Sequence, residues 1–568
     1  MKPKATTSHR TPKDPVLILG AGINGAALAR ELVLNGVSVV VVDRQDLAAG
    51  TTAYSSRLIH GGLRYLEYGD FELVRESLAE RTRWLRLAPH LVKPLRLFIP
   101  VESRWGGFGA ALRNFLGVRQ RPEQQPPHQK RGLWTIRAGL WLYDRYARDQ
   151  TLTRYRVYRL PDPQLPFVNR EKYHWACAYY DAQLRFPERF TLELLIDARQ
   201  IARDAGIEFQ LFTYHRAVRS DERIKIVALD GRSTSLSFAP TAIINATGAW
   251  ADLTLSELGV PSKKLLGGTK GSHFVTFHRE LVELLDGNGV YAEAADGRPV
   301  FILPFGEAVL VGTTDEPFDG DPDTARATPA ELRYLMAAVH EVFPQVTLED
   351  TDIELVYSGV RPLPATGPAT PAAITRRHWL EEHAGASVPC YSIIGGKLTT
   401  CRSLAESAAH TILARLGQPQ GALSDERPLP GSQTEPADDE RTLAESCSVS
   451  IETIAAVRSL YGRRTKTVLS ACLHGAEHVV FEPQKLLDGT HYPIALARYM
   501  VEHEWVRRLE DFVERRLMLL YHRPLTRRCL EQLADVLVQS KVLQLDDVDR
   551  EIGGILERLQ DRFQKRVT

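Results

Sequence analysis

The sequence predicts an α/β protein with a second, α+β domain and an all-α C-terminal domain. Three observations predict this fold class. A strand–helix–strand unit opens the chain after residue 15, strand-like segments recur between 207 and 313, and helical patterns dominate beyond residue 440. The chain of 568 residues is also too long for one hydrophobic core, so several domains are expected.

The first unit consists of a buried strand, a helix and a second buried strand. Residues 16–20 (VLILG) form a short apolar run that is typical of a parallel strand. The following segment places apolar side chains at helical spacing and reaches Gly36, which favours the end of a helix. Residues 37–43 (VSVVVVD) form the second apolar run, which completes a βαβ unit.

Glycines at the first strand–helix turn predict a dinucleotide site. Residues 20–25 (GAGING) match the pattern G-x-G-x-x-G, which permits a tight turn and lets backbone N–H groups reach a pyrophosphate at the helix N-terminus. Asp43 ends the second strand, where a carboxylate accepts hydrogen bonds from a ribose diol. The candidate residues of the turn are Gly20, Gly22, Asn24 and Gly25.

The later elements follow in chain order. Helices are expected over 70–90, 133–147, 191–206 and 329–343. Strands are expected within 207–238, before the turn at 245–248, and at 272–277, 299–304 and 308–313. Residues 104–132 look irregular, the proline- and acid-rich stretch 419–440 is a linker, and the remainder is mostly helical.

Two further glycine-rich segments favour FAD over NAD as the dinucleotide. The first follows a strand and contains Ala246, Thr247 and Gly248; the second, at 395–400, leads into a helix. Three separated glycine-rich turns fit an extended FAD better than a nicotinamide cofactor, because the second helix N-terminus suits the flavin end. The candidates in the last turn are Gly395, Gly396, Lys397, Leu398 and Thr399.

Composition excludes several classes of protein. Lys and Arg total 71 against 70 for Asp and Glu, which argues against a general nucleic-acid binder. Six scattered cysteines without a CxxC pair indicate reduced thiols rather than disulfides or a zinc site. The acidic stretch 319–323 lacks the glycine and glutamate that a calcium loop needs, so no metal is expected. No apolar segment suits a signal peptide or a membrane span, so an intracellular protein is expected.

Several segments together resemble the FAD-dependent glycerol-3-phosphate dehydrogenases. They are GAGINGAALARE, SSRLIHGGLRYLEYGDFELV, LAERTRWLRLAPHL, INATGAWA, KGSHFV, VGTTDEPFDGDP, YSGVRPL, AITR and GGKLTTCR, in that order between about residues 15 and 415. The resemblance implies a Rossmann-like FAD-binding domain with a substrate-cap domain of the glycine-oxidase and D-amino-acid-oxidase type. It also implies oxidation of sn-glycerol 3-phosphate to dihydroxyacetone phosphate, with electrons passed to membrane quinone.

The resemblance also implies boundaries and flavin contacts. The expected organisation is a tail (1–14), a discontinuous FAD-binding domain (15–95, 170–260, 355–418), a cap domain (96–169, 261–354), a linker (419–440) and a helical domain (441–568). The glycines at 61 and 62 are expected where the backbone runs close to the flavin ring, because a Cβ would clash there. By analogy, the remaining cofactor contacts are Thr51, Thr52, Ser55, Ser56, Leu58, His60, Gly61 and Gly62.

The substrate that the resemblance implies carries a phosphate with a charge of about −2, which requires cations with directed donors. Arg64, Arg361 and Lys397 lie in matching motifs and are the candidates, and Tyr65 adds a hydroxyl. Either arginine alone could instead form a surface ion pair.

Hydride loss from C2 requires a base for the hydroxyl proton, and histidine is the usual choice near neutral pH. His273 is the first candidate for contact with substrate, and His60 is the second, with a place on the flavin wall. Lys397 could also stabilise negative charge on the reduced flavin. Each histidine could instead be a hydrogen-bonded core residue.

Basic and aromatic residues alternate between 104 and 148, which suits a surface that contacts anionic lipid and a quinone. The protein is therefore expected in the cytoplasm, attached peripherally to the inner face of the membrane. A cap helix packed on its own core is the alternative. An oxygen-using glycerol-phosphate oxidase, a glycine- or sarcosine-type amine oxidase and a non-catalytic FAD scaffold stay open as functions, and a homodimer stays open as the assembly.

Overall fold

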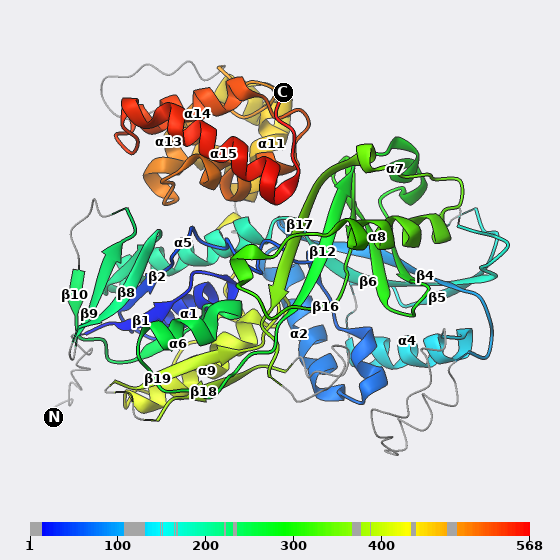
Figure 1. Cartoon of the computed structure of the whole chain (residues 1–568), viewed down its shortest axis with the longest axis horizontal. Coiled ribbons are helices and arrows are strands. Elements are labelled where there is room, and N and C mark those ends of the chain that lie inside the picture. The colour runs from blue at the N-terminus through cyan, green and yellow to red at the C-terminus, as the bar shows by residue number, and fades with distance from the viewer. Residues whose placement is uncertain are drawn as a thin grey trace, which may run out of the picture.

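The computed structural model places two large sheets side by side, with a helical domain above them (Figure 1). The six-stranded sheet and the ten-stranded sheet are the frame on which the candidate site is built. The described residues are 14–106, 131–147, 149, 151–163, 165, 168–220, 223–230, 236–365, 377–384, 386, 388–432, 439–473 and 485–568.

The six-stranded sheet has the order β18-β19-β11-β1-β2-β7 and is parallel except for the edge strand β18. All of its parallel strands therefore end at the same edge, which is where the predicted glycine turns lie. The strands are β1 (Val16–Leu19), β2 (Val39–Val42), β7 (Phe209–Phe212), β11 (Ile243–Asn245), β18 (Trp379–Glu382) and β19 (Cys390–Ile394).

Alternate side chains of these strands enter two separate cores. On one face, Ile18 and Val41 pack against α1 (Ile23–Leu34), α5 (Pro187–Ala205) and α9 (Cys401–Arg415). The other face packs on α6 (Ala251–Glu257) and on a three-stranded sheet. That sheet consists of β8 (His215–Ser220), β9 (Arg223–Ala228) and β10 (Leu236–Phe238).

The ten-stranded sheet has the order β16-β12-β15-β14-β13-β4-β6-β3, with β17 paired to β12 and β5 to β6. Helices α7 (Arg279–Leu285) and α8 (Pro329–Val342) share the core on one of its faces. Its strands are β3 (Leu58–Ile59), β4 (Val92–Val101), β5 (Arg156–Arg159), β6 (Trp175–Leu184), β12 (Thr269–Thr276), β13 (Gly289–Glu293), β14 (Pro299–Phe305), β15 (Ala308–Gly312), β16 (Glu316–Pro317) and β17 (Ile353–Arg361).

One apolar core crosses the other face of this sheet and continues into the C-terminal helices. It includes side chains of α2 (Phe71–Leu87) and α4 (Leu133–Ala147), which lie below the sheet in Figure 1. The C-terminal domain is helical as predicted, with α10 (Glu440–Cys447), α11 (Ile451–Tyr461), α12 (Thr465–Leu473), α13 (Ile494–His503), α14 (Arg527–Gln539) and α15 (Val548–Phe563).

Most of the predicted helices appear close to their expected bounds, whereas two long strands escaped prediction. Helix α4 matches its predicted range, and α5 begins four residues before the predicted start at 191. β4 and β6 pair along their whole length, although β4 contains Pro94 and Pro100. Its other neighbour, β13, pairs only with Leu97 and Phe98, so neither proline interrupts that ladder.

The strands of the ten-stranded sheet come from both of the expected domains. β6 and β17 lie in the ten-stranded sheet, although their residues fall mainly in segments expected to belong to the FAD-binding domain. The boundaries given above therefore stay predictions.

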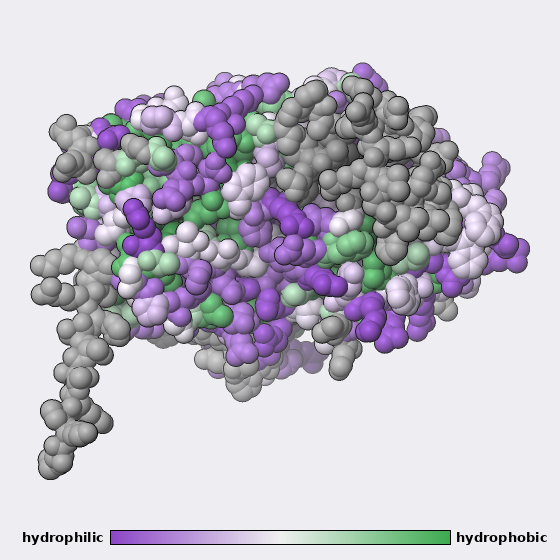
Figure 2. Space-filling model, turned by 90° about the horizontal axis from the view of Figure 1, so that it is seen from below, coloured by the Kyte–Doolittle hydropathy of each residue, from purple (hydrophilic) through white to green (hydrophobic). Residues whose placement is uncertain are grey.

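The face seen from below mixes hydrophilic and hydrophobic residues (Figure 2). Among the described residues, no helix combines the length and the apolar character needed to cross a bilayer.

Candidate active site

One cavity opens at the carboxyl edge of the six-stranded sheet and extends to the ten-stranded sheet. Its lining contains residues from the ends of β1, β2 and β11, from the turn after β19, and from β12 and β17. The predicted site residues that line it are Gly20, Gly22, Asn24, Asp43, Thr51, Thr52, Ser55, Ser56, Leu58, His60, Tyr65, Ala246, Thr247, Gly248, His273, Arg361, Gly395, Gly396, Lys397, Leu398 and Thr399.

The first glycine turn has no room for a side chain at Gly20 or at Gly25. Gly20 has a φ of +100°, and a Cβ there would lie 2.6 Å from the carbonyl oxygen of Ala246. A Cβ on Gly22 would lie 3.4 Å from Thr52 Oγ1, on the wall of the cavity. The turn therefore brings bare backbone to the N-terminus of α1, which is a cradle suited to a pyrophosphate.

Asp43 is held in place by two backbone donors. The N–H groups of Ala21 and Gln45 donate to its carboxylate at 2.7 and 2.9 Å. Burial raises the pKa of Asp43 to about 6. The group is therefore ionised near neutral pH and keeps further acceptor sites for ribose hydroxyls.

Asn24 joins the first and third glycine turns. Its side-chain amide donates to the carbonyl oxygen of Gly395 at 3.3 Å, and a Cβ on Gly396 would lie 2.6 Å from the same amide nitrogen. Its Oδ1 is buried and has no partner among the described residues. A buried acceptor beside the cavity is the feature expected where a polar cofactor completes the hydrogen bonding. The site thus fits FAD.

The segment around His60 is tied to the turn after β19. The His60 N–H donates to Thr399 Oγ1 at 3.1 Å, and Thr399 Oγ1 donates to the His60 carbonyl at 3.3 Å. The His60 ring stacks on Tyr65, whose ring centroid lies 3.9 Å from Lys397 Nζ. His60, Tyr65 and Lys397 therefore form one group on the cavity wall.

Three predicted glycines lie outside the cavity lining. A Cβ on Gly61 would overlap Leu78 and the Tyr143 hydroxyl, and a Cβ on Gly62 would overlap Tyr65. Gly25 packs against the carbonyl of Gly20. The protein's own packing thus explains these glycines, and the flavin contact expected for Gly61 and Gly62 stays a prediction. The side chain of Arg64 lies outside the described part of the structure.

His273 lies in β12 and is 2 % exposed. Its Nε2 is 2.9 Å from Ser56 Oγ, and its ring stacks on Tyr357 at a centroid distance of 4.9 Å. Burial, reinforced by the positive charges of Arg361 and Arg57, holds the pKa of His273 well below its usual value. The imidazole is therefore neutral near pH 7 and able to accept a proton.

Arg361 ends β17 and presents its guanidinium to the same cavity. Nη1 donates to Asp315 Oδ1 at 2.9 Å, and Nη2 donates to Thr313 Oγ1 and to the Thr314 carbonyl, each at 3.0 Å. Gly271 leaves room for this arrangement, because a Cβ there would overlap the guanidinium. The cation is thus held in one orientation.

The sequence did not predict a role for Arg57, which also lines the cavity. Its buried guanidinium pairs with Glu188 at 2.6 Å and donates to the hydroxyl of Tyr521. The residue lies inside the SSRLIHGG segment, but its partners are 131 and 464 positions away. No local pattern reveals such partners.

Comparison with known proteins gives two family matches. The model described as "FAD dependent oxidoreductase" matches residues 15–402. The model described as "C-terminal domain of alpha-glycerophosphate oxidase" matches residues 423–548. Together they cover the two sheets and most of the helical domain.

Curated relatives and a solved structure agree with these matches. The chain is 33 % identical over 525 residues to glycerol-3-phosphate dehydrogenase of Synechocystis, with 88 % of each chain covered. It is 31 % identical to D-erythritol 1-phosphate dehydrogenase of Brucella abortus, with 89 % of this chain and 94 % of the relative covered. The structure of glycerol-3-phosphate dehydrogenase from Bacillus halodurans in complex with FAD superposes with a TM-score of 0.69 at 21 % identity, and covers 97 % of this chain and 95 % of its own.

Proposed function

The chain belongs to the family of FAD-dependent glycerol-3-phosphate dehydrogenases, and from this premise we propose that it oxidises sn-glycerol 3-phosphate to dihydroxyacetone phosphate and passes the electrons to quinone. One observation carries the proposal. A buried, neutral His273 shares a cavity with the two cations Arg361 and Lys397. A secondary alcohol that carries a phosphate needs this combination of a base and cations.

FAD is the cofactor, and when bound it supplies the acceptor for the hydride that leaves C2. The glycine turn at 20–25 and Asp43 hold its pyrophosphate and ribose in this proposal. The His60–Tyr65–Lys397 group on the cavity wall would hold its flavin end, where the Lys397 cation would stabilise negative charge.

His273 takes the hydroxyl proton at Nε2, the nitrogen that lies beside Ser56. Ser56 and the ring of Tyr357 orient the imidazole, so that the base is held before substrate arrives. Arg361, which Asp315 and Thr313 hold in place, binds the anionic substrate. His60 is the second candidate for the base.

Exposed tryptophans support the membrane part of the proposal. Trp105, Trp134 and Trp141 are 69, 41 and 60 % exposed and line one open groove with Arg137. The Arg137 guanidinium lies 4.8 Å from the Trp134 ring centroid. Indoles beside cations suit the headgroup region of an anionic leaflet, where a quinone acceptor is reached. The protein is thus proposed to attach peripherally to the inner face of the cytoplasmic membrane.

D-erythritol 1-phosphate is the second candidate substrate, because the relative named for it is nearly as similar as the one named for glycerol 3-phosphate. Both molecules offer a secondary alcohol and a phosphate. Steady-state assays of the FAD-loaded protein with each compound, with a soluble quinone as acceptor, distinguish them. A kcat/KM for glycerol 3-phosphate below that for D-erythritol 1-phosphate would reverse the assignment.

The acceptor has its own assay. Stoichiometric hydrogen peroxide from the purified protein in air, without quinone, would favour the oxidase alternative. Electron transfer that depends on added quinone would favour the proposal.

A further inference from the structure

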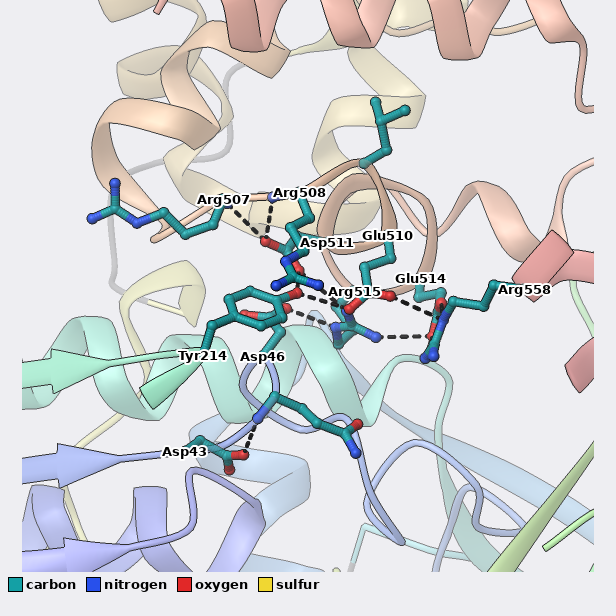
Figure 3. Close-up of polar contacts among 12 residues, drawn as sticks. Asp43, Asp46, Tyr214, Arg507, Arg508, Glu510, Asp511, Glu514, Arg515 and Arg558 are labelled. Carbon is teal, nitrogen blue, oxygen red and sulfur yellow. Dashed lines mark hydrogen bonds and ion pairs between the residues drawn. The ribbon is translucent and has the colours of Figure 1, made fainter. Parts of the chain in front are cut away.

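The segment between β2 and β3 is anchored at both ends by the C-terminal helical domain. We call residues 46–57 the cofactor loop, because Thr51, Thr52, Ser55 and Ser56 within it line the cavity. Figure 3 shows the first anchor, where side chains of the helical domain reach down to Asp46 just above Asp43.

Asp46 is fully buried and bound by two adjacent arginines. Arg515 Nε lies 2.6 Å from Oδ2, and Arg516 donates to both carboxylate oxygens at 2.6 and 2.9 Å. Burial alone raises the pKa of Asp46, but the two guanidinium groups more than offset it, so the pKa lies below its usual value. Asp46 is therefore ionised throughout the neutral range.

Both arginines belong to the π-helical segment Asp511–Arg516, and the same network secures this segment within the helical domain. Arg515 also contacts Glu514 at 2.8 Å, and Glu514 accepts from Arg558 of α15 at 3.0 Å. Arg516 Nε donates to the carbonyl oxygen of Glu504 at 2.9 Å. The anchor is thus part of the rigid interior of the helical domain, not a loose surface pair.

Arg57 is the second anchor, at the far end of the cofactor loop. Its guanidinium donates to the Tyr521 hydroxyl and lies 4.7 Å from the Tyr521 ring centroid. It also donates to Glu188 and to the carbonyl of Ala53, which is inside the loop, at 3.0 Å. The positive φ of Arg57, +57°, is held by these contacts.

The cofactor loop also touches the glycine turn directly. Thr52 Oγ1 accepts from the Ile23 N–H at 3.1 Å, at the N-terminus of α1. The two anchors therefore determine where the loop hydroxyls lie relative to the cradle for the pyrophosphate.

We propose that the C-terminal helical domain is a structural part of the FAD site: it orders the cofactor loop through Asp46 and Arg57, so that Asp46, Arg515, Arg516 and Tyr521 act as positioning residues for FAD. A loop that is ordered in advance spares the cofactor the conformational entropy of ordering it. The helical domain thus governs FAD retention, a role independent of which substrate the enzyme oxidises.

The direct test is Asp46→Asn in the full chain, with FAD affinity measured by reconstitution of the apoprotein and quenching of flavin fluorescence. The lost charge pairing frees the loop, so we expect the Kd for FAD to rise about tenfold or more. At saturating FAD, the KM for substrate is expected to stay unchanged, because Asp46 does not line the cavity.

The matched control is Glu504→Gln. It removes a buried ion pair of the same kind between the same two parts of the chain, Arg189 to Glu504 at 2.6 Å. The main-chain carbonyl of Glu504, which accepts from Arg516, stays in place, and the side chain of Glu504 does not contact the cofactor loop. We expect its Kd for FAD to stay within about threefold of wild type, even if its Tm falls as far as that of Asp46→Asn. Equal loss of FAD in both variants would reduce the effect to general destabilisation and overturn the proposal.

Tyr521→Phe covers the case in which Asp46→Asn does not fold. It removes one hydrogen bond to Arg57 and keeps the ring, so the fold should persist while FAD dissociates a few-fold faster. Amide hydrogen exchange over 46–57 in the apoprotein should also accelerate. Wild-type FAD release and wild-type exchange in this variant would contradict the role of the second anchor.

Discussion

At the scale of single residues, the site contains two groups whose burial shifts their pKa values in opposite directions. Burial keeps His273 neutral by lowering its pKa, and burial raises the pKa of Asp43 to about 6. In both cases a charged form is disfavoured in the folded protein. His273 is thereby neutral near pH 7, and Asp43 ionises only above weakly acidic pH.

Replacement of His273 tests its role as the base. His273→Asn should slow flavin reduction by glycerol 3-phosphate by about 10² to 10⁴, because general-base catalysis is worth that much. FAD content should stay that of wild type. Stopped-flow absorbance under anaerobic conditions measures the rate, and His60→Asn serves as the parallel variant. A larger loss in His60→Asn than in His273→Asn would transfer the role to His60.

Asp43 predicts a pH dependence of FAD binding. In the proposed site the ionised carboxylate accepts hydrogen bonds from the ribose hydroxyls, so FAD affinity should rise with pH up to about 6 and then level off. The free energy of unfolding of the apoprotein has the opposite pH dependence. The raised pKa of Asp43 stabilises the folded state fully below about pH 4, and this contribution is lost as the pH rises through about 6. Titration of the apoprotein with FAD between pH 5 and 8 measures the curve. Asp43→Asn should bind more weakly and without this dependence, whereas a flat curve in wild type would refute the assignment.

At the scale of elements, the turn between β1 and α1 brings bare backbone to the cavity where FAD is proposed to bind. Gly20→Ala should destabilise the protein by about 2 kcal/mol or more and lower its FAD content, because the φ is positive and the new Cβ meets the Ala246 carbonyl. Thermal unfolding and flavin absorbance measure both effects.

Gly36→Ala is the control for that change. Gly36 also has a positive φ, +78°, but nothing lies within 4 Å of the added Cβ. It should cost about 1 kcal/mol and leave FAD content intact. Equal loss of FAD in the two variants would mean that close packing at Gly20 is not what the cofactor requires.

The elements that sequence reasoning could predict are those with local signals. The βαβ unit, the glycine turns and helix α4 depend on periodicity and composition over a few residues. β4 and β6 were missed for two reasons. The two prolines in β4 argue against a strand, and each strand is stabilised by its pairing with the other rather than by a local sequence pattern. Arg57 and Asp46 were missed for a related reason. Their contacts with the helical domain are to residues more than 450 positions away. Nothing in the local sequence therefore distinguishes them from ordinary surface charges.

At the scale of the whole molecule, the groove at Trp105, Trp134 and Trp141 is the proposed contact with lipid. The double change Trp105→Ala with Trp141→Ala should weaken co-sedimentation with vesicles that contain anionic lipid about tenfold, because two exposed indoles are lost from the interface. Trp379→Ala is the control, since that side chain is also exposed but lies on β18 of the other sheet. Equal effects of the two changes, or no effect of the first, would exclude this surface.

Anaerobic titration of the FAD-loaded protein tests the proposal that a phosphorylated polyol reduces its FAD. Addition of sn-glycerol 3-phosphate should bleach the flavin absorbance with about one equivalent of substrate, since hydride transfer reduces one flavin per substrate. Failure of the flavin to bleach with either glycerol 3-phosphate or D-erythritol 1-phosphate would contradict the account.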